Sequence, residues 1–306
     1  MINKEQGKVI VYGFDSASAD IANLTAELKN KSIYHCTGYD LPTDFQGLTL
    51  FDSHIAFLNL TALKSELVNR ITNAKYSDAV TLTKNLSILS NDRVDRMDLV
   101  REVVESLLGS DTTTQEKLMS YAYQLWDQDF KEVVRSSFPF HFKLILGEEN
   151  VTIVNLEYQQ PLKLGETLDQ DNDRRAWGGG SVKTSKKVSW RFIPVWKDNG
   201  VTFKIYNVEC DMYLKLAVGT RDGDRSAWGS TESDLDRHRY FLKPYMKDDT
   251  IFFYIINWQY RQGLKLAATS DAKGDHSLWG HNGDIYNVNK FNVNDELLKF
   301  IYLIVS

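Results

Sequence analysis

The sequence predicts an α+β protein in which an N-terminal helical domain precedes a C-terminal β-trefoil. Apolar residues recur every three or four positions across residues 54–137, as they do in amphipathic helices. Residues 140–293 instead alternate apolar and polar side chains, and they contain one motif three times. We therefore expect an N-terminal extension at residues 1–50, the helical domain at residues 51–138 and the β-trefoil at residues 139–306.

The helical prediction depends on three apolar stripes. They comprise Leu60, Leu63, Leu67 and Ile71, then Met97, Val100, Val103, Val104 and Leu107, and then Leu118, Tyr121, Ala122, Leu125, Trp126, Val133 and Val134. Gly109 follows the second stripe as a C-terminal stop, and Pro139 ends the third. Thr113 and Glu116 have the spacing of a capping box. We interpret all three stripes as core and not as a ligand groove.

The repeated motif ends in Trp-Gly and recurs at a constant step of 51 residues. Its copies contain Asp173, Trp177 and Gly178, then Asp224, Trp228 and Gly229, and then Asp275, Trp279 and Gly280, preceded by Leu-Lys-Leu at residues 162–164, 214–216 and 264–266. A fixed period indicates one supersecondary unit repeated in space. Such units cannot each bury an apolar face alone, so they share one core.

Each unit reads as four strands, which predicts a closed six-stranded barrel capped by three hairpins and without a free sheet edge. The first strand type occurs at residues 140–146, 189–196 and 239–245, and weakly at 289–293; its partners are residues 151–156, 201–206 and 251–256. Three-fold symmetry needs only three copies of the first type. One of the two terminal copies is therefore a closing or supplementary strand. The pattern does not show which of the two copies it is.

Composition excludes several classes of partner. The chain of 306 residues has a formal net charge of −5, so no global basic field attracts nucleic acid. No stretch reaches the ~20 apolar residues of a transmembrane segment, and no secretory signal is visible before the short apolar run at residues 9–12. The apolar tail at residues 297–305 is best interpreted as a strand or a docked terminus.

No catalytic or metal motif is recognisable. The chain contains no Gly-x-Ser-x-Gly, His-Glu-x-x-His or Cys-x-x-Cys, so we predict no enzymatic activity, no cofactor and no metal site. Residues 169–173 alternate oxygen donors as a calcium loop does, but Arg174 and Gly180 stand where that loop needs glycine and glutamate. The basic cluster with Arg174 and Arg175 is either a solvated face or a contact for anionic glycans or lipid headgroups.

The candidate carbohydrate-binding residues are the repeated aspartates and tryptophans. They are Asp173, Trp177, Asp224, Trp228, Asp275 and Trp279. An indole packs on the C–H face of a pyranose, and a carboxylate accepts hydrogen bonds from its hydroxyls. The structural alternative stays open: the tryptophans would form a core layer, and each aspartate would bond its own backbone in a turn.

Several short motifs together resemble a known family. They are Tyr121-Ala122-Tyr123-Gln124-Leu125-Trp126, Phe138-Pro139 followed by Phe142 and Leu144, Val188-Ser189-Trp190 with Trp196, Val201-Thr202-Phe203-Lys204-Ile205, Phe252-Phe253-Tyr254-Ile255, and the Gly-Asp-Arg/His…Trp-Gly loops. Over roughly residues 60–293 the sequence is similar to the lepidopteran low-molecular-mass (30 kDa) haemolymph lipoproteins. The chain departs from this family at residues 1–50, which have no counterpart there, and at Leu118 and Ser137, where many members carry a cysteine pair.

The resemblance implies a helical domain joined to a β-trefoil, an extracellular location in haemolymph, and no catalysis. It also implies a storage and carrier role with a small-molecule lipid or sugar, or a peptide, as the ligand. We therefore expect a non-enzymatic haemolymph-type storage and ligand-carrier protein that binds lipid, carbohydrate or both. The alternative is a peptide- or protein-binding β-trefoil, such as a hormone carrier or a protease inhibitor.

Overall fold

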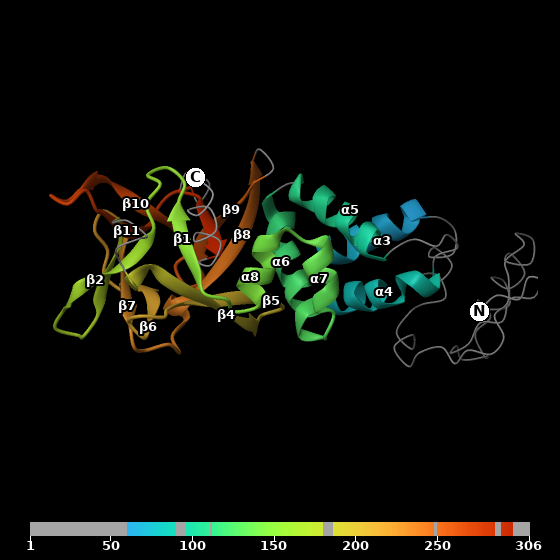
Figure 1. The fold of residues 1–306 in the computed structure, drawn as a ribbon, viewed down its shortest axis with the longest axis horizontal. Helices are drawn as coiled ribbons and strands as arrows, with labels where there is room; N and C mark the ends of the chain where they lie inside the picture. Colours follow the sequence, from blue (N-terminus) through green and yellow to red (C-terminus); the bar gives the residue numbers. More distant parts are fainter. Residues whose placement is uncertain are drawn as a thin grey trace, which may run out of the picture. The chain divides into compact units, whose positions relative to one another are not determined.

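A computed structural model describes residues 60–89, 96–110, 112–179, 186–247, 250–284 and 289–295 (Figure 1). These residues divide into two compact units, and the division falls between Val103 and Val104. The predicted extension at residues 1–50 and the apolar tail at residues 297–305 lie outside the described residues. No helix in the described part of the chain combines the length and the apolar character that a membrane span requires.

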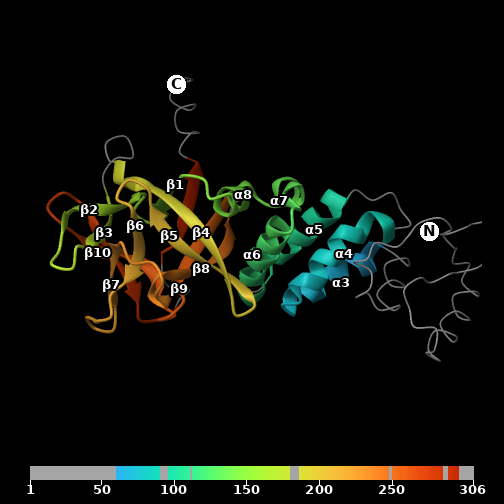
Figure 2. The same ribbon diagram turned by 90° about the horizontal axis from the view of Figure 1, so that it is seen from below.

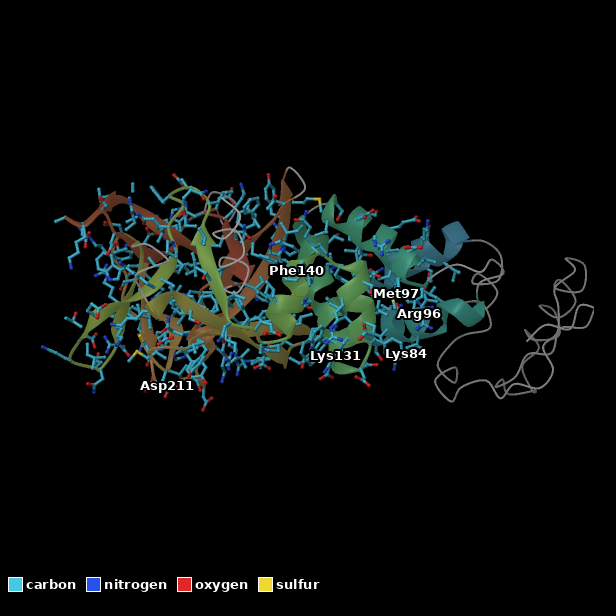
Figure 3. The ribbon with its side chains drawn as sticks, in the orientation of Figure 1. Lys84, Arg96, Met97, Lys131, Phe140 and Asp211 are labelled. Carbon is cyan, nitrogen blue, oxygen red and sulfur yellow. The ribbon has the colours of Figure 1, made fainter. Side chains whose placement is uncertain are left out.

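The first unit contains helices α3 (Leu60–Thr72) and α4 (Tyr76–Leu89) and the beginning of α5 (Arg96–Leu108). The predicted stripe on α3 is core, because Leu67 and Ile71 are fully buried. Arg70 ties α3 to α4, since its Nη1 donates to the carbonyl of Asp78 at 3.1 Å. Arg96 at the start of α5 likewise donates to the carbonyl of Lys84 in α4 at 2.7 Å (Figure 3).

The second unit contains twelve described strands in one antiparallel sheet. They are β1 (Val151–Asn155), β2 (Leu162–Leu168), β3 (Arg174–Gly178), β4 (Ser189–Lys197), β5 (Gly200–Asn207), β6 (Met212–Leu216), β7 (Arg225–Ser230), β8 (Arg239–Lys247), β9 (Thr250–Asn257), β10 (Gly263–Ser270), β11 (His276–His281) and β12 (Phe291–Asp295). We group them into repeat 1 (β12, β1, β2 and β3), repeat 2 (β4 to β7) and repeat 3 (β8 to β11). The predicted strands of repeats 2 and 3 are confirmed.

The strand pairing closes a ring of six strands in the order β1, β4, β5, β8, β9 and β12, with β12 returning to β1. The hairpins β2–β3, β6–β7 and β10–β11 cap one end, where β3, β7 and β11 pair with one another. Within this unit the caps lie at the opposite end of the ring from helices α6 (Thr112–Asp127) and α8 (Phe140–Leu146) (Figure 2). We call this arrangement the trefoil-like barrel.

Equivalent positions in the three repeats carry equivalent side chains. A buried aromatic residue in the first strand of each repeat pairs with a buried asparagine in the second strand: Trp190 with Asn207, Tyr240 with Asn257, and Phe291 with Asn155. Each asparagine Oδ1 accepts a hydrogen bond from a nearby backbone amide, of Cys210, Tyr260 or Glu157, at 3.0 to 3.1 Å. The aromatic ring fills the core and the asparagine closes the following turn.

The predicted strand at residues 140–146 is wrong, because this segment is helix α8. The strand position beside β1 is filled by β12 over five residue pairs, so the closing copy is the C-terminal one. Pro139 has a φ of −54°, which suits the residue before a helix, and Phe142 and Ile145 are fully buried. Phe140 is 43% exposed and lies on the surface (Figure 3). A segment of seven residues is too short for its period to distinguish a strand from a helix.

Helix α6 packs against β5 and β8 of the barrel. The hydroxyl of Ser120 accepts a hydrogen bond from the amide of Val201 at 3.1 Å. The ring of Tyr123 stacks on Trp196, with 5.7 Å between centroids and 15° between planes. The third predicted stripe is divided between α6 and α7 (Lys131–Ser137), because Asp129 adopts a left-handed φ of 66° between them.

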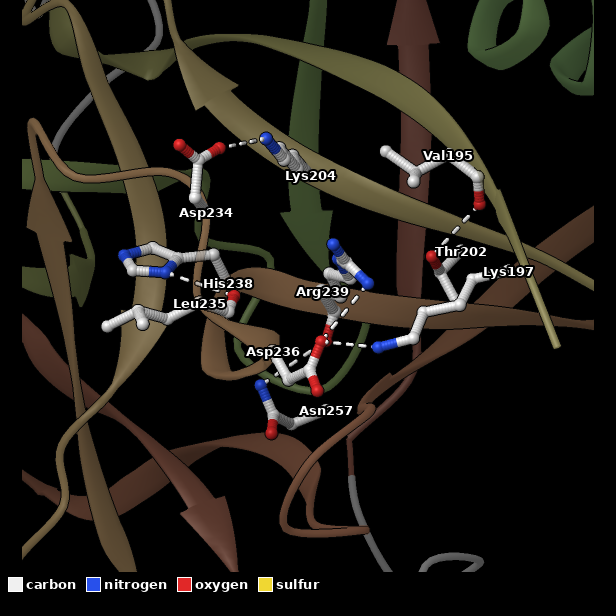
Figure 4. Close-up of polar contacts among 10 residues, drawn as sticks. All are labelled: Val195, Lys197, Thr202, Lys204, Asp234, Leu235, Asp236, His238, Arg239 and Asn257. Atoms are coloured by element: carbon white, nitrogen blue, oxygen red, sulfur yellow. Dashed lines mark hydrogen bonds and ion pairs between the residues drawn. The ribbon is translucent and has the colours of Figure 1, made fainter.

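A polar network surrounds the short turn that precedes β8 (Figure 4). The carboxylate of Asp236 lies 2.8 Å from Lys197 Nζ and 3.1 Å from Arg239 Nη1. The side chain of His238 is fully buried, and its Nδ1 lies 3.3 Å from the carbonyl oxygen of Leu235. Burial lowers the pKa of His238 to about 4, so this imidazole is neutral in the folded protein at neutral pH.

We predict that stability falls as the pH drops from about 6.5 to about 4, because the unfolded histidine takes up a proton that buried His238 does not. Between pH 7 and pH 4.5 this contribution is about 2–3 kcal/mol. Urea unfolding at both values measures it, and His238→Gln should flatten the dependence by that amount. An unchanged slope in His238→Gln would refute the assignment.

Candidate functional site

The three repeated tryptophans converge at the capped end of the barrel. Trp177, Trp228 and Trp279 lie on β3, β7 and β11, and their side chains are half-buried. The Cζ atom of Arg175 lies 5.4, 5.7 and 5.1 Å from the centres of these three rings. Each distance is within the range of a cation–π contact. The indoles therefore form a cage, which we call the tryptophan cage, around one guanidinium group.

Arg175 breaks the symmetry of the repeats. It stands two residues before Trp177, where the other two repeats have Ser226 and Ser277. Those serines accept hydrogen bonds from the Nε1 atoms of Trp228 and Trp279, at 2.9 and 2.7 Å. A small residue therefore stands at this position in two of the three repeats, and repeat 1 is the exception.

None of the repeated aspartates forms an ion pair with Arg175, which lies among the three tryptophans. Each carboxylate instead binds the lysine of the Leu-Lys-Leu motif in another repeat: Asp173 with Lys215 at 2.6 Å, Asp224 with Lys265 at 2.7 Å, and Asp275 with Lys163 at 2.5 Å. These pairs connect repeat 1 to 2, 2 to 3 and 3 to 1. We call them the inter-repeat ion pairs.

The repeated glycines are also explained by contacts between repeats. A Cβ atom on Gly178, Gly229 or Gly280 would lie 2.3, 2.4 or 2.4 Å from a leucine methyl carbon, of Leu266, Leu164 and Leu216 respectively. Each of these leucines is the last residue of a Leu-Lys-Leu motif in another repeat. Glycine lets the leucine approach the backbone closely, so the same motif supplies one ion pair and one apolar contact to its neighbours.

A polar cavity of about 560 Å³ lies beside the tryptophan cage. It is lined by Glu157, Tyr158, Arg175, Arg221, Asp222, Asp224, Lys265, Leu266, Ala267, Ala268, Thr269, Ser277, Trp279 and Asn289. Of the six candidate site residues, the cavity contains Asp224 and Trp279, which come from different repeats. The other four do not line it. Sequence reasoning missed Tyr158 and Arg221, and Tyr158 stacks on His276 with 4.2 Å between ring centres.

The carboxylate of Asp224 is hydrogen-bonded to protein groups, whereas Arg175 lies close to the like charge of Arg221. Asp224 accepts hydrogen bonds from Lys265, His281 and the amide of Asn282. Burial acts to raise the pKa of Asp224, but these hydrogen bonds outweigh it and leave the pKa lowered. Burial, and then the like charge of Arg221, lower the pKa of Arg175, although a guanidinium remains protonated. The cavity therefore offers an indole wall, hydroxyl groups and two arginines as binding groups.

We predict that Lys215→Met lowers the free energy of unfolding by about 3–5 kcal/mol, because it leaves the carboxylate of Asp173 buried without its cation. The two side chains are only 8% and 11% exposed. Urea unfolding followed by far-UV circular dichroism measures the loss. Lys204→Met is the matched control, since its partner Asp234 is 96% exposed and solvent screening should make the cost much smaller than for Lys215→Met.

The double variant Lys215→Met with Asp173→Leu should recover most of the loss, because replacing both partners of a buried pair leaves no unpaired charge. Equal losses for Lys215→Met and Lys204→Met would show that the inter-repeat ion pair contributes no more than a surface pair.

The family model for the lepidopteran low molecular weight (30 kD) lipoproteins matches residues 61–293. Microvitellogenin of Manduca sexta is 35% identical over 232 residues, which cover 76% of this chain and 89% of that protein. Low molecular mass lipoprotein 3 of Bombyx mori is 35% identical over 224 residues, which cover 73% of this chain and 84% of that protein.

Among solved structures, the designed 3-fold symmetric protein ThreeFoil aligns with a TM-score of 0.38 and 10% sequence identity. The alignment covers 48% of this chain and 98% of that one. The family model spans both units of the described structure, and the two relatives are matched over most of their own length. The chain therefore belongs to the family of lepidopteran low molecular weight (30 kD) lipoproteins.

Proposed function

We propose that this chain is a non-enzymatic storage and carrier protein of haemolymph, and that its trefoil-like barrel is a β-trefoil that binds carbohydrate. Membership of the lipoprotein family supports the carrier role and an extracellular location. In this proposal residues 139–306 form the β-trefoil domain, and the helices within residues 51–138 carry lipid, as the word lipoprotein in the family name suggests.

The observation that carries the carbohydrate proposal is the cavity beside Trp279. Trp279, the hydroxyl-bearing residues Thr269 and Ser277, and the two arginines line the same space of about 560 Å³. This combination suits a pyranose, which has an apolar C–H face and a rim of hydroxyls. We assign ligand contact to Trp279 and Asp224 among the six candidates. Asp173, Trp177, Trp228 and Asp275 are proposed to serve the fold.

We predict that Trp279→Ala weakens the binding of a simple sugar or a glucan at least ~10-fold, since it removes the stacking surface. Isothermal titration calorimetry of the full chain measures the affinity, and far-UV circular dichroism checks that the variant is folded. The control is Trp196→Ala, which removes a 36% exposed indole outside the cavity and should leave affinity unchanged.

Wild-type protein that binds no sugar at all would contradict the carbohydrate proposal. Binding of a peptide through one hairpin, unaffected by competing sugars, would instead favour the alternative of a peptide- or protein-binding β-trefoil.

A further inference from the structure

We propose that Arg175 and Arg221 form an anion-recognising pair in this cavity, so that it prefers a saccharide bearing a carboxylate or sulfate group over a neutral one. The inference rests on the proposed carbohydrate binding and names the class of sugar. It starts from two arginines that line one cavity without a carboxylate partner among the described residues.

Three carboxylates line the cavity, and none of them forms an ion pair with either arginine among the described residues. The carboxylate of Asp224 is occupied by Lys265, and that of Glu157 accepts a hydrogen bond from Asn289. Asp222 is exposed to solvent and forms no ion pair with another described residue. An anion entering the cavity would therefore meet two guanidinium groups whose donors are not committed to protein carboxylates.

Without a bound anion, holding the Arg175 side chain in this position costs free energy. Its guanidinium is partly desolvated, it lies near the like charge of Arg221, and its Nε is buried without a hydrogen-bond partner. A bound carboxylate or sulfate would supply the missing acceptor and offset the repulsion between the two cations. Because guanidinium donors form a planar fork, they suit anions that have two or more oxygen atoms.

The tryptophan cage fixes Arg175 in advance of binding. Three indole rings within 5.1 to 5.7 Å surround its Cζ atom, so little freedom remains to be lost when a ligand binds. Both arginines are also departures from the repeat. Serines replace Arg175 in the other two repeats, and Gln170 and Ala272 stand at the positions equivalent to Arg221. One anion site is therefore expected and not three.

The test compares D-glucuronate with D-glucose, two sugars whose rings differ only at the C6 carboxylate, by isothermal titration of the full chain. Wild-type protein should bind glucuronate about 10-fold more tightly than glucose, and 0.5 M NaCl should reduce this preference. Arg221→Gln should bring the two affinities within about 2-fold of each other. Lys273→Gln removes one exposed positive charge from the corresponding loop of repeat 3 and should keep the wild-type preference.

Equal wild-type affinities for glucose and glucuronate would overturn this inference and leave the proposed carbohydrate binding intact. Binding of inorganic phosphate without either sugar would overturn both, because the arginines would then recognise a free anion. A preference that persists in both Arg221→Gln and Arg175→Ser would place the recognition elsewhere, and folding of the two variants is checked by circular dichroism.

Discussion

The barrel depends on contacts that one repeat makes with the next. A repeat of four short strands cannot bury both faces of its own cap hairpin. The inter-repeat ion pairs and the leucine–glycine contacts complete each cap with residues from its neighbours. Because repeat 3 also binds repeat 1, the contacts form a closed circuit. This requirement explains why aspartate and glycine recur at a step of 51 residues, and why every repeat also carries the lysine and leucine of a Leu-Lys-Leu motif.

The positions at which the repeats differ are therefore more informative about function than the positions that they share. Symmetric positions such as Trp190, Tyr240 and Phe291 fill the core in the same way in every repeat. Arg175 and Arg221 occur once each, and neither fills the core nor pairs with a carboxylate of the described residues. Both line the cavity next to Trp279. Residues that break a structural repeat and carry an electrostatic cost are the ones expected to serve binding.

Much of the fold could be predicted from the sequence, because period and spacing report directly on burial. The stripe ending at Ile71 lies on α3, and the alternation at residues 201–206 lies on β5. The strand prediction for residues 140–146 failed because the pairing of β12 with β1 closes the barrel. This pairing joins residues far apart in the sequence, and it decides which copy becomes the strand. The tryptophans were correctly seen as related positions, but their common neighbour Arg175 could only be found by comparing the repeats position by position.

Native-state hydrogen exchange tests most directly whether the three repeats form one interlocked unit. If they do, the slowest amides of β3, β7 and β11 should share one opening free energy, equal to that of global unfolding, because no cap can open without breaking contacts with both neighbours. A cap that exchanges through an opening several kcal/mol easier than the other two would contradict this account of the barrel.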